Sequence, residues 1–147
     1  MGYQAGSQYQ SQHAVAIGRE AGYNIQSSGS IAIGYFAGRI NQGTSAIALG
    51  DQAGSTGQSQ YAVAIGYQSG QTGQGTNSVA IGAQAGQTRQ GTNAIAIGAQ
   101  AGSTGQGISA IAIGSNAGQT NQGQYAVAMG YQAVKQTNAR VRLLLGI

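Results

Sequence analysis

A glycine recurs every sixteen residues along the chain, and this spacing constrains the fold more than any other feature. With this glycine as position 1, residues 2–145 form nine copies of the consensus G-Y-Q-A-G-Q-T-x-Q-G-x-x-A-I-A-I. Such a fixed period is typical of proteins in which each repeat stacks on its neighbours. The series has no insertion or deletion and comprises Gly2, Gly18, Gly34, Gly50, Gly66, Gly82, Gly98, Gly114, Gly130 and Gly146.

The length of the repeat favours β-structure. Repeats built from helix pairs need about 33 residues or more. The 27 glycines of the chain would also weaken helices, at up to about 1 kcal/mol each. We therefore predict an all-β fold, a parallel β-solenoid or β-roll of nine 16-residue coils. Regular coils are expected over residues 1–133, and a degenerate last coil, cap or stalk junction over residues 134–147.

One strand of each coil is predicted to be apolar on both faces. Positions 14 and 16 are aliphatic or Met, as in Val63 and Ile65, and alternation along a strand puts both on one face. Position 15 is alanine in eight copies. Because neither face is polar, both should be covered. We expect the aliphatic face to fill the coil and the alanine face to form an oligomer interface. The predicted interface comprises Ala16, Ala32, Ala48, Ala64, Ala80, Ala96, Ala112 and Ala128.

The polar columns have two interpretations. Position 9 is glutamine from Gln10 to Gln122, and stacked glutamines are expected to form amide ladders that stabilise the stack. Exposed tyrosines either bind sugars or proteins or cover the corners of the coils. Candidate surface-binding residues are Tyr35, Tyr61, Tyr67, Tyr125, Tyr131, Thr56, Thr72, Thr88, Thr104 and Thr120.

Sparse charge excludes several classes of function. The chain has one His, six Lys and Arg, and two Asp and Glu, too few for a catalytic acid–base pair or a metal cluster. We therefore expect no enzyme activity and no cofactor or metal. Scattered basic residues argue against nucleic-acid binding, and no apolar run could span a membrane. Lys135, Arg140 and Arg142 in the last repeat are expected to form a cap. The first repeat has no comparable change, so head-to-tail stacking is a further hypothesis.

Three segments carry a recognisable motif, namely residues 13–18, 77–82 and 93–98. They resemble the head repeat of trimeric autotransporter adhesins of the YadA type, whose motif Asn-Ser-Val-Ala-Ile-Gly is matched outright by residues 77–82. The resemblance implies a left-handed parallel β-roll, three of which pack around an axis into a head that binds host surfaces. Similar repeats occur in fibre and surface proteins of large viruses and phages.

These observations give one leading functional hypothesis and two alternatives. The leading hypothesis is a structural and adhesive head or shaft of a homotrimeric fibre on an extracellular or virion surface, with a glycan or protein surface as ligand. One alternative is a capsid-associated or self-assembling filament subunit of a large virus or phage. The other is an ice-binding solenoid, motivated by the threonine column at position 7.

Overall fold

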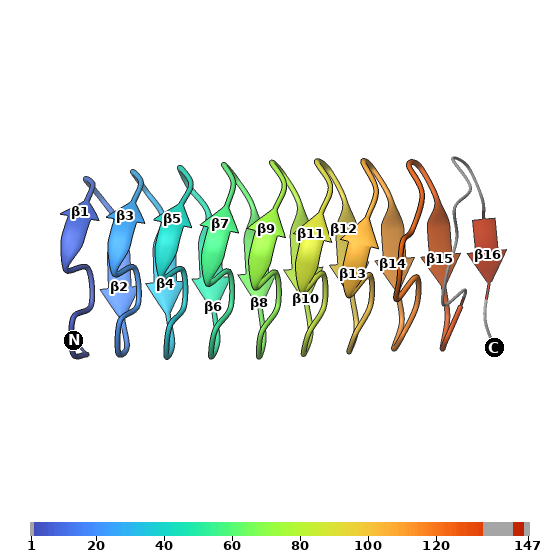
Figure 1. Ribbon diagram of the computed structural model, residues 1–147, viewed down its shortest axis with the longest axis horizontal. Coiled ribbons are helices and arrows are strands. Elements are labelled where there is room, and N and C mark those ends of the chain that lie inside the picture. The colour runs from blue at the N-terminus through green and yellow to red at the C-terminus, as the bar shows by residue number, and fades with distance from the viewer. Residues whose placement is uncertain (1, 134–142, 146–147) are drawn as a thin grey trace.

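The computed structural model describes residues 2–133 and 143–145, which form a stack of flattened coils along one axis (Figure 1). All strand pairs are parallel, and every strand has three residues. The predicted all-β parallel solenoid is therefore confirmed. Residues 134–142, which include the proposed cap residues Lys135, Arg140 and Arg142, lie outside the described part of the chain.

Each of the first seven coils contributes one strand to each of two sheets. We call the seven-stranded sheet, which runs β1-β3-β5-β7-β9-β11-β13, sheet A, and the nine-stranded sheet, which runs β2-β4-β6-β8-β10-β12-β14-β15-β16, sheet B. The strands of sheet A are β1 (Gln8–Gln10), β3 (Asn24–Gln26), β5 (Ile40–Gln42), β7 (Thr56–Gln58), β9 (Thr72–Gln74), β11 (Thr88–Gln90) and β13 (Thr104–Gln106). The strands of sheet B are β2 (Val15–Ile17), β4 (Ile31–Ile33), β6 (Ile47–Leu49), β8 (Val63–Ile65), β10 (Val79–Ile81), β12 (Ile95–Ile97), β14 (Ile111–Ile113), β15 (Val127–Met129) and β16 (Leu143–Leu145).

The strand register converts the sequence repeat into columns of equivalent residues. Val63 pairs with Val79 and Ala64 with Ala80, so partners are one repeat apart. Backbone hydrogen bonds continue through the turns, where the Gly66 amide donates to the Leu49 carbonyl at 2.8 Å. Any insertion would shift a residue out of its column and break these bonds, which explains the strict spacing.

The recurrent glycine at position 1 is required by the turns that follow the sheet B strands from β2 to β15. Gly82 has φ of +124°, a conformation open to glycine alone among the common residues. A Cβ atom at this position would also lie 2.8 Å from the carbonyl carbon of Gly98 in the next coil. Both the backbone conformation and the close approach of successive coils therefore exclude a side chain here.

The alanine column lies inside the coil, so the prediction that it contacts a second chain is wrong. All eight members are buried within the single chain, with exposed fractions from 0 to 8%: Ala16, Ala32, Ala48, Ala64, Ala80, Ala96, Ala112 and Ala128. The interior is narrow, since a Cβ built on Gly86 would lie 3.2 Å from the Ala80 Cβ. Only methyl groups fit between the sheets at this point, and the larger aliphatic side chains must point outwards.

The largest buried side chains are glutamines of position 9, which cross the coil from sheet A to sheet B. Gln74 Nε2 donates to the Val63 carbonyl at 2.7 Å and to Gln90 Oε1 at 3.1 Å, while Gln74 Oε1 accepts from Gln58 Nε2 at 3.2 Å. The predicted amide ladder is therefore confirmed, in the core of the solenoid. Its continuous part comprises Gln42, Gln58, Gln74, Gln90, Gln106 and Gln122.

Candidate interaction surfaces

The outer surface of sheet B is apolar along the described part of the stack. Because position 15 points into the coil, positions 14 and 16 point out of it, and their side chains are half-buried or exposed, up to 50% for Ile17. Continuous exposed apolar surface of this kind marks an interaction site. We call this surface the aliphatic face; it comprises Val15, Ile17, Ile31, Ile33, Ile47, Leu49, Val63, Ile65, Val79, Ile81, Ile95, Ile97, Ile111, Ile113, Val127 and Met129.

The five candidate tyrosines are all exposed and border the strands of sheet B. Tyr61 precedes β8 and Tyr67 follows it, and Tyr125 and Tyr131 flank β15 in the same way. Tyr35 follows β4. The structure therefore divides the tyrosines between the two rows of turns. The sequence did not indicate that they border an apolar surface, because the prediction placed the aliphatic side of the strand inside the coil and the alanine side outside.

The candidate threonines form a single row on sheet A. Thr56, Thr72, Thr88 and Thr104 pair in register, and Thr120 joins them through a bridge to Thr104. Thr56 and Thr72 are exposed, and the other three are half-buried. Position 8 beside them is mostly glycine in these coils, and position 9 is the buried glutamine. The surface of sheet A thus has one row of hydroxyls rather than two.

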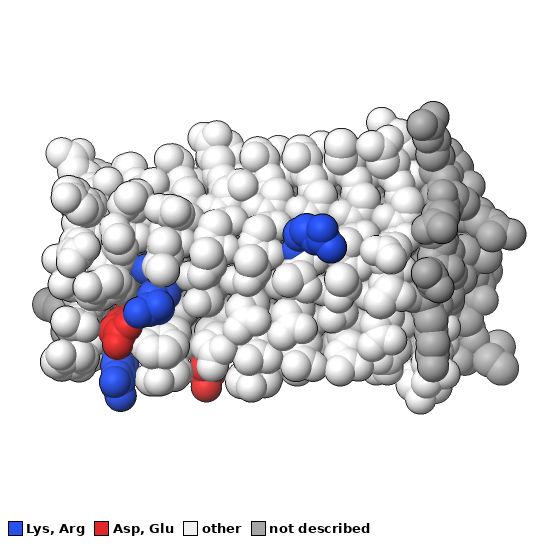
Figure 2. Space-filling view, viewed as in Figure 1, with Lys and Arg blue, Asp and Glu red and all other residues white. Residues whose placement is uncertain are grey.

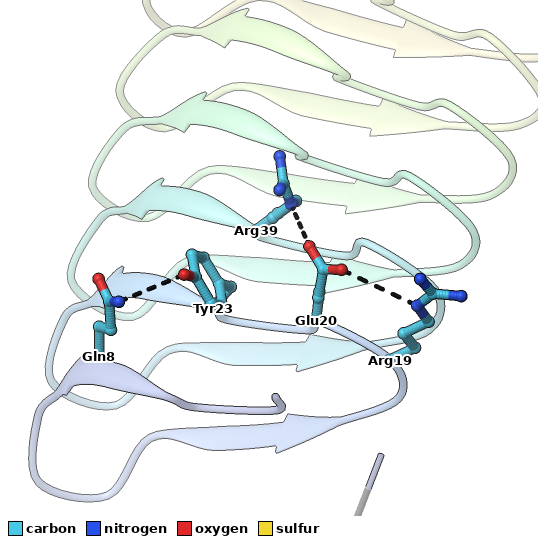
Figure 3. Close-up of polar contacts among 5 residues, drawn as sticks. All are labelled: Gln8, Arg19, Glu20, Tyr23 and Arg39. Carbon is cyan, nitrogen blue, oxygen red and sulfur yellow. Dashed lines mark hydrogen bonds and ion pairs between the residues drawn. The ribbon is translucent and has the colours of Figure 1, made fainter. Parts of the chain in front are cut away.

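A charged cluster lies in the turns of the first coils, on a surface that is otherwise nearly free of charge (Figure 2). Glu20 Oε2 accepts a hydrogen bond from Arg39 Nε at 2.8 Å, and Glu20 Oε1 lies 3.8 Å from Arg19 Nε (Figure 3). In the sequence these arginines look scattered. Arg39 reaches Glu20 because a separation of nineteen residues is one coil plus three positions, and Arg19 is the neighbour of Glu20 in the chain.

The geometry offers surfaces rather than cavities. In the described part of the chain there is no pocket and no group of three or more potential metal ligands among His, Cys, Asp and Glu. No helix among the same residues is long and apolar enough to cross a bilayer. What the coils present is the aliphatic face, the threonine row, the bordering tyrosines and the charged cluster.

Comparison with known proteins identifies the repeat. The family model described as the YadA head domain repeat matches in two copies, covering residues 42–69, 74–85 and 90–117. No curated protein and no solved structure matches the chain. The matched residues include the motif of residues 77–82 and the strands of sheet B from β6 to β14. The chain therefore contains YadA-like head repeats within residues 42–117.

Proposed function

We propose that this protein is the structural and adhesive head or shaft of a homotrimeric surface fibre, and that the aliphatic face is the contact between its three chains. The observation that carries this proposal is the orientation of the side chains on the sheet B strands. They direct alanine into the coil and Val, Ile, Leu or Met out of it. A chain that leaves its largest apolar side chains outside needs a partner to cover them.

The energetics favour association. Full burial of a Val, Ile or Leu side chain is worth about 1.5–3 kcal/mol relative to full exposure. The half-exposed members of the aliphatic face retain roughly 1 kcal/mol each. Their sum over the described coils is of the order of 10 kcal/mol, comparable with the cost of bringing chains together. The likeness of residues 42–117 to the head repeat of trimeric adhesins supports three chains rather than two.

Adhesion would use the surfaces that such a trimer leaves open. With sheet B at the interface, the threonine row of sheet A and the outer turns remain accessible. These surfaces are flat and almost uncharged, so each contact is expected to be weak, and three chains with repeated coils supply avidity. The function we propose involves no catalysis, and its place is an extracellular surface, either of a cell or of a virion.

The interface is tested by changing the aliphatic face alone. The double variant Ile81→Thr, Ile97→Thr keeps β-branched residues in β10 and β12 but removes apolar surface from the centre of the face. We expect its solution mass, measured by light scattering on a sizing column, to fall towards that of one chain. The matched control is Ile108→Thr, which makes the same change at an exposed turn residue outside the face. An unchanged trimer in the double variant would contradict the proposed interface.

The adhesive part of the proposal has its own test. Tyr61, Tyr67, Tyr125 and Tyr131 are replaced together by asparagine, which tolerates turn conformations, and attachment to an immobilised panel of glycans and matrix proteins is compared. We expect attachment to fall several-fold, whereas Tyr9→Asn on β1 should leave it unchanged. If the variant remains a trimer and attaches as well as the wild type, these tyrosines are not the adhesive residues.

A further inference from the structure

The charged cluster of the first coils has the composition of a ligand site. It comprises Arg19, Glu20 and Arg39 with the rings of Tyr3, Tyr23, Tyr35 and Phe36 around them. We propose that this cluster binds the carboxylate of an acidic sugar, of the sialic or uronic acid class. The inference rests on the adhesive half of the proposed function and is independent of the trimer.

Glu20 forms a hydrogen bond with Arg39 and a longer ion pair with Arg19. Its side chain is only 12% exposed, and it meets Arg39 Nε at 2.8 Å and Arg19 Nε at 3.8 Å. Both contacts use Nε, and the terminal nitrogens of each arginine point away from Glu20 (Figure 3). A guanidinium group can bind a carboxylate through two parallel hydrogen bonds, and the terminal nitrogens that point away from Glu20 can donate them to a ligand. Fixing an arginine in advance also lowers the entropy lost on binding.

The charge balance favours an anion. Two arginines face one glutamate, so the cluster keeps a net charge of about +1. Among the described residues, no ion pair joins Asp51 to either arginine. Nearly all of the surrounding surface is uncharged (Figure 2), so little else competes for an acidic ligand.

The aromatic rings favour a sugar over an acidic peptide. The Arg19 guanidinium lies between two tyrosines of the same column, 5.9 Å from the Tyr3 ring centroid and 5.7 Å from that of Tyr35. Both rings are exposed, Tyr3 to 68%. Such rings offer a flat apolar surface and a hydroxyl, which suit the face and edge of a pyranose ring. Arg39 is packed over Phe36 at 4.9 Å and is 35% exposed, so Arg19 is the more accessible arginine.

The test compares ligands that differ only in the carboxylate. The full chain is titrated with a sialylated trisaccharide, with a glucuronate-terminated disaccharide and with the carboxyl-reduced form of each, and binding is followed by NMR. We expect at least one acidic sugar to bind and its reduced form to bind at least tenfold more weakly. The variant Arg19→Gln should lose at least tenfold in affinity. The matched control Arg89→Gln removes another exposed arginine, on β11, and should bind as the wild type does.

Several outcomes would overturn the assignment. These are failure of both acidic sugars to bind, equal binding of the reduced sugars, or an equal effect of Arg19→Gln and Arg89→Gln. The mass of Arg19→Gln is measured in parallel. If the wild-type chain is a trimer that binds no acidic sugar, the proposed site is wrong and the proposed fibre stands. If it is a monomer that binds an acidic sugar, the site stands and the proposed fibre is wrong.

Discussion

At the scale of single residues, the interior of this solenoid is unusual because its largest buried side chains are amides. Gln74 is 1% exposed and contacts three neighbouring groups through hydrogen bonds, one on the facing sheet and two in adjacent coils. Buried polar groups stabilise a fold only when their hydrogen bonds are complete. The glutamine column meets that condition along most of its length, and it links sheet A to sheet B where a methyl group could not reach.

Breaking the ladder at its centre should destabilise the chain. Gln74→Leu keeps the approximate size of the side chain but leaves the Val63 carbonyl and Gln90 Oε1 each without one partner. We expect a loss of about 2–4 kcal/mol in the free energy of unfolding, since each unsatisfied buried group costs roughly 1–3 kcal/mol. Denaturant unfolding measures this loss. Gln60→Leu, at an exposed turn residue, should change stability by less than about 0.5 kcal/mol. Equal losses in both variants would show that the ladder does not stabilise the core.

The glycine of position 1 provides a second residue-scale prediction. Gly82→Ala places a Cβ atom 2.8 Å from the carbonyl carbon of Gly98, at φ of +124°. We expect it to cost about 3 kcal/mol or more, or to prevent folding. Gly73→Ala is the matched control, because its Cβ would lie 3.8 Å from the nearest atom and Arg89 occupies the equivalent position of the next coil. It should cost only about 1 kcal/mol in thermal unfolding. A mild effect of Gly82→Ala would contradict the close stacking of coils.

At the scale of elements, the two sheets differ in what they present to their surroundings. Sheet B presents the aliphatic face, and sheet A presents one row of threonines beside glycine and a buried glutamine. The assignment of faces was the part of the fold that the sequence predicted wrongly. Hydrophobicity alone puts isoleucine inside, but the narrow interior has room only for alanine at position 15. The useful signal was size: position 15 is alanine in eight copies, whereas positions 14 and 16 vary among Val, Ile, Leu and Met.

The single threonine row bears on the ice-binding hypothesis. A flat array that matches a crystal lattice needs hydroxyls spaced in two directions, and sheet A repeats them only along the solenoid axis, at about 4.8 Å. We therefore expect no thermal hysteresis in a freezing-point assay at millimolar concentration. The same concentration of a protein without repeats is the control. Measurable thermal hysteresis that Thr72→Val abolishes would contradict this expectation and support ice binding.

At the scale of the whole molecule, the period of the sequence was sufficient to predict the solenoid, its parallel sheets and its columns. Each column in the structure joins residues one repeat apart, as Gln58 and Gln74 show. The cluster of Arg19, Glu20 and Arg39 could not be predicted from the repeat, because these residues depart from the consensus. Their meeting depends on the positions of two turns in space, which only the folded coils define.

The solution mass of the wild-type chain tests the central claim most directly. Light scattering on a sizing column, at several protein and salt concentrations, compares the particle with the 14.6 kDa of one chain. We predict a mass of three chains that persists at high salt, because an interface of Val, Ile and Leu side chains is not screened. A mass that grows with concentration would favour the filament alternative. A mass of one chain would contradict the account, because the aliphatic face would then remain open to water.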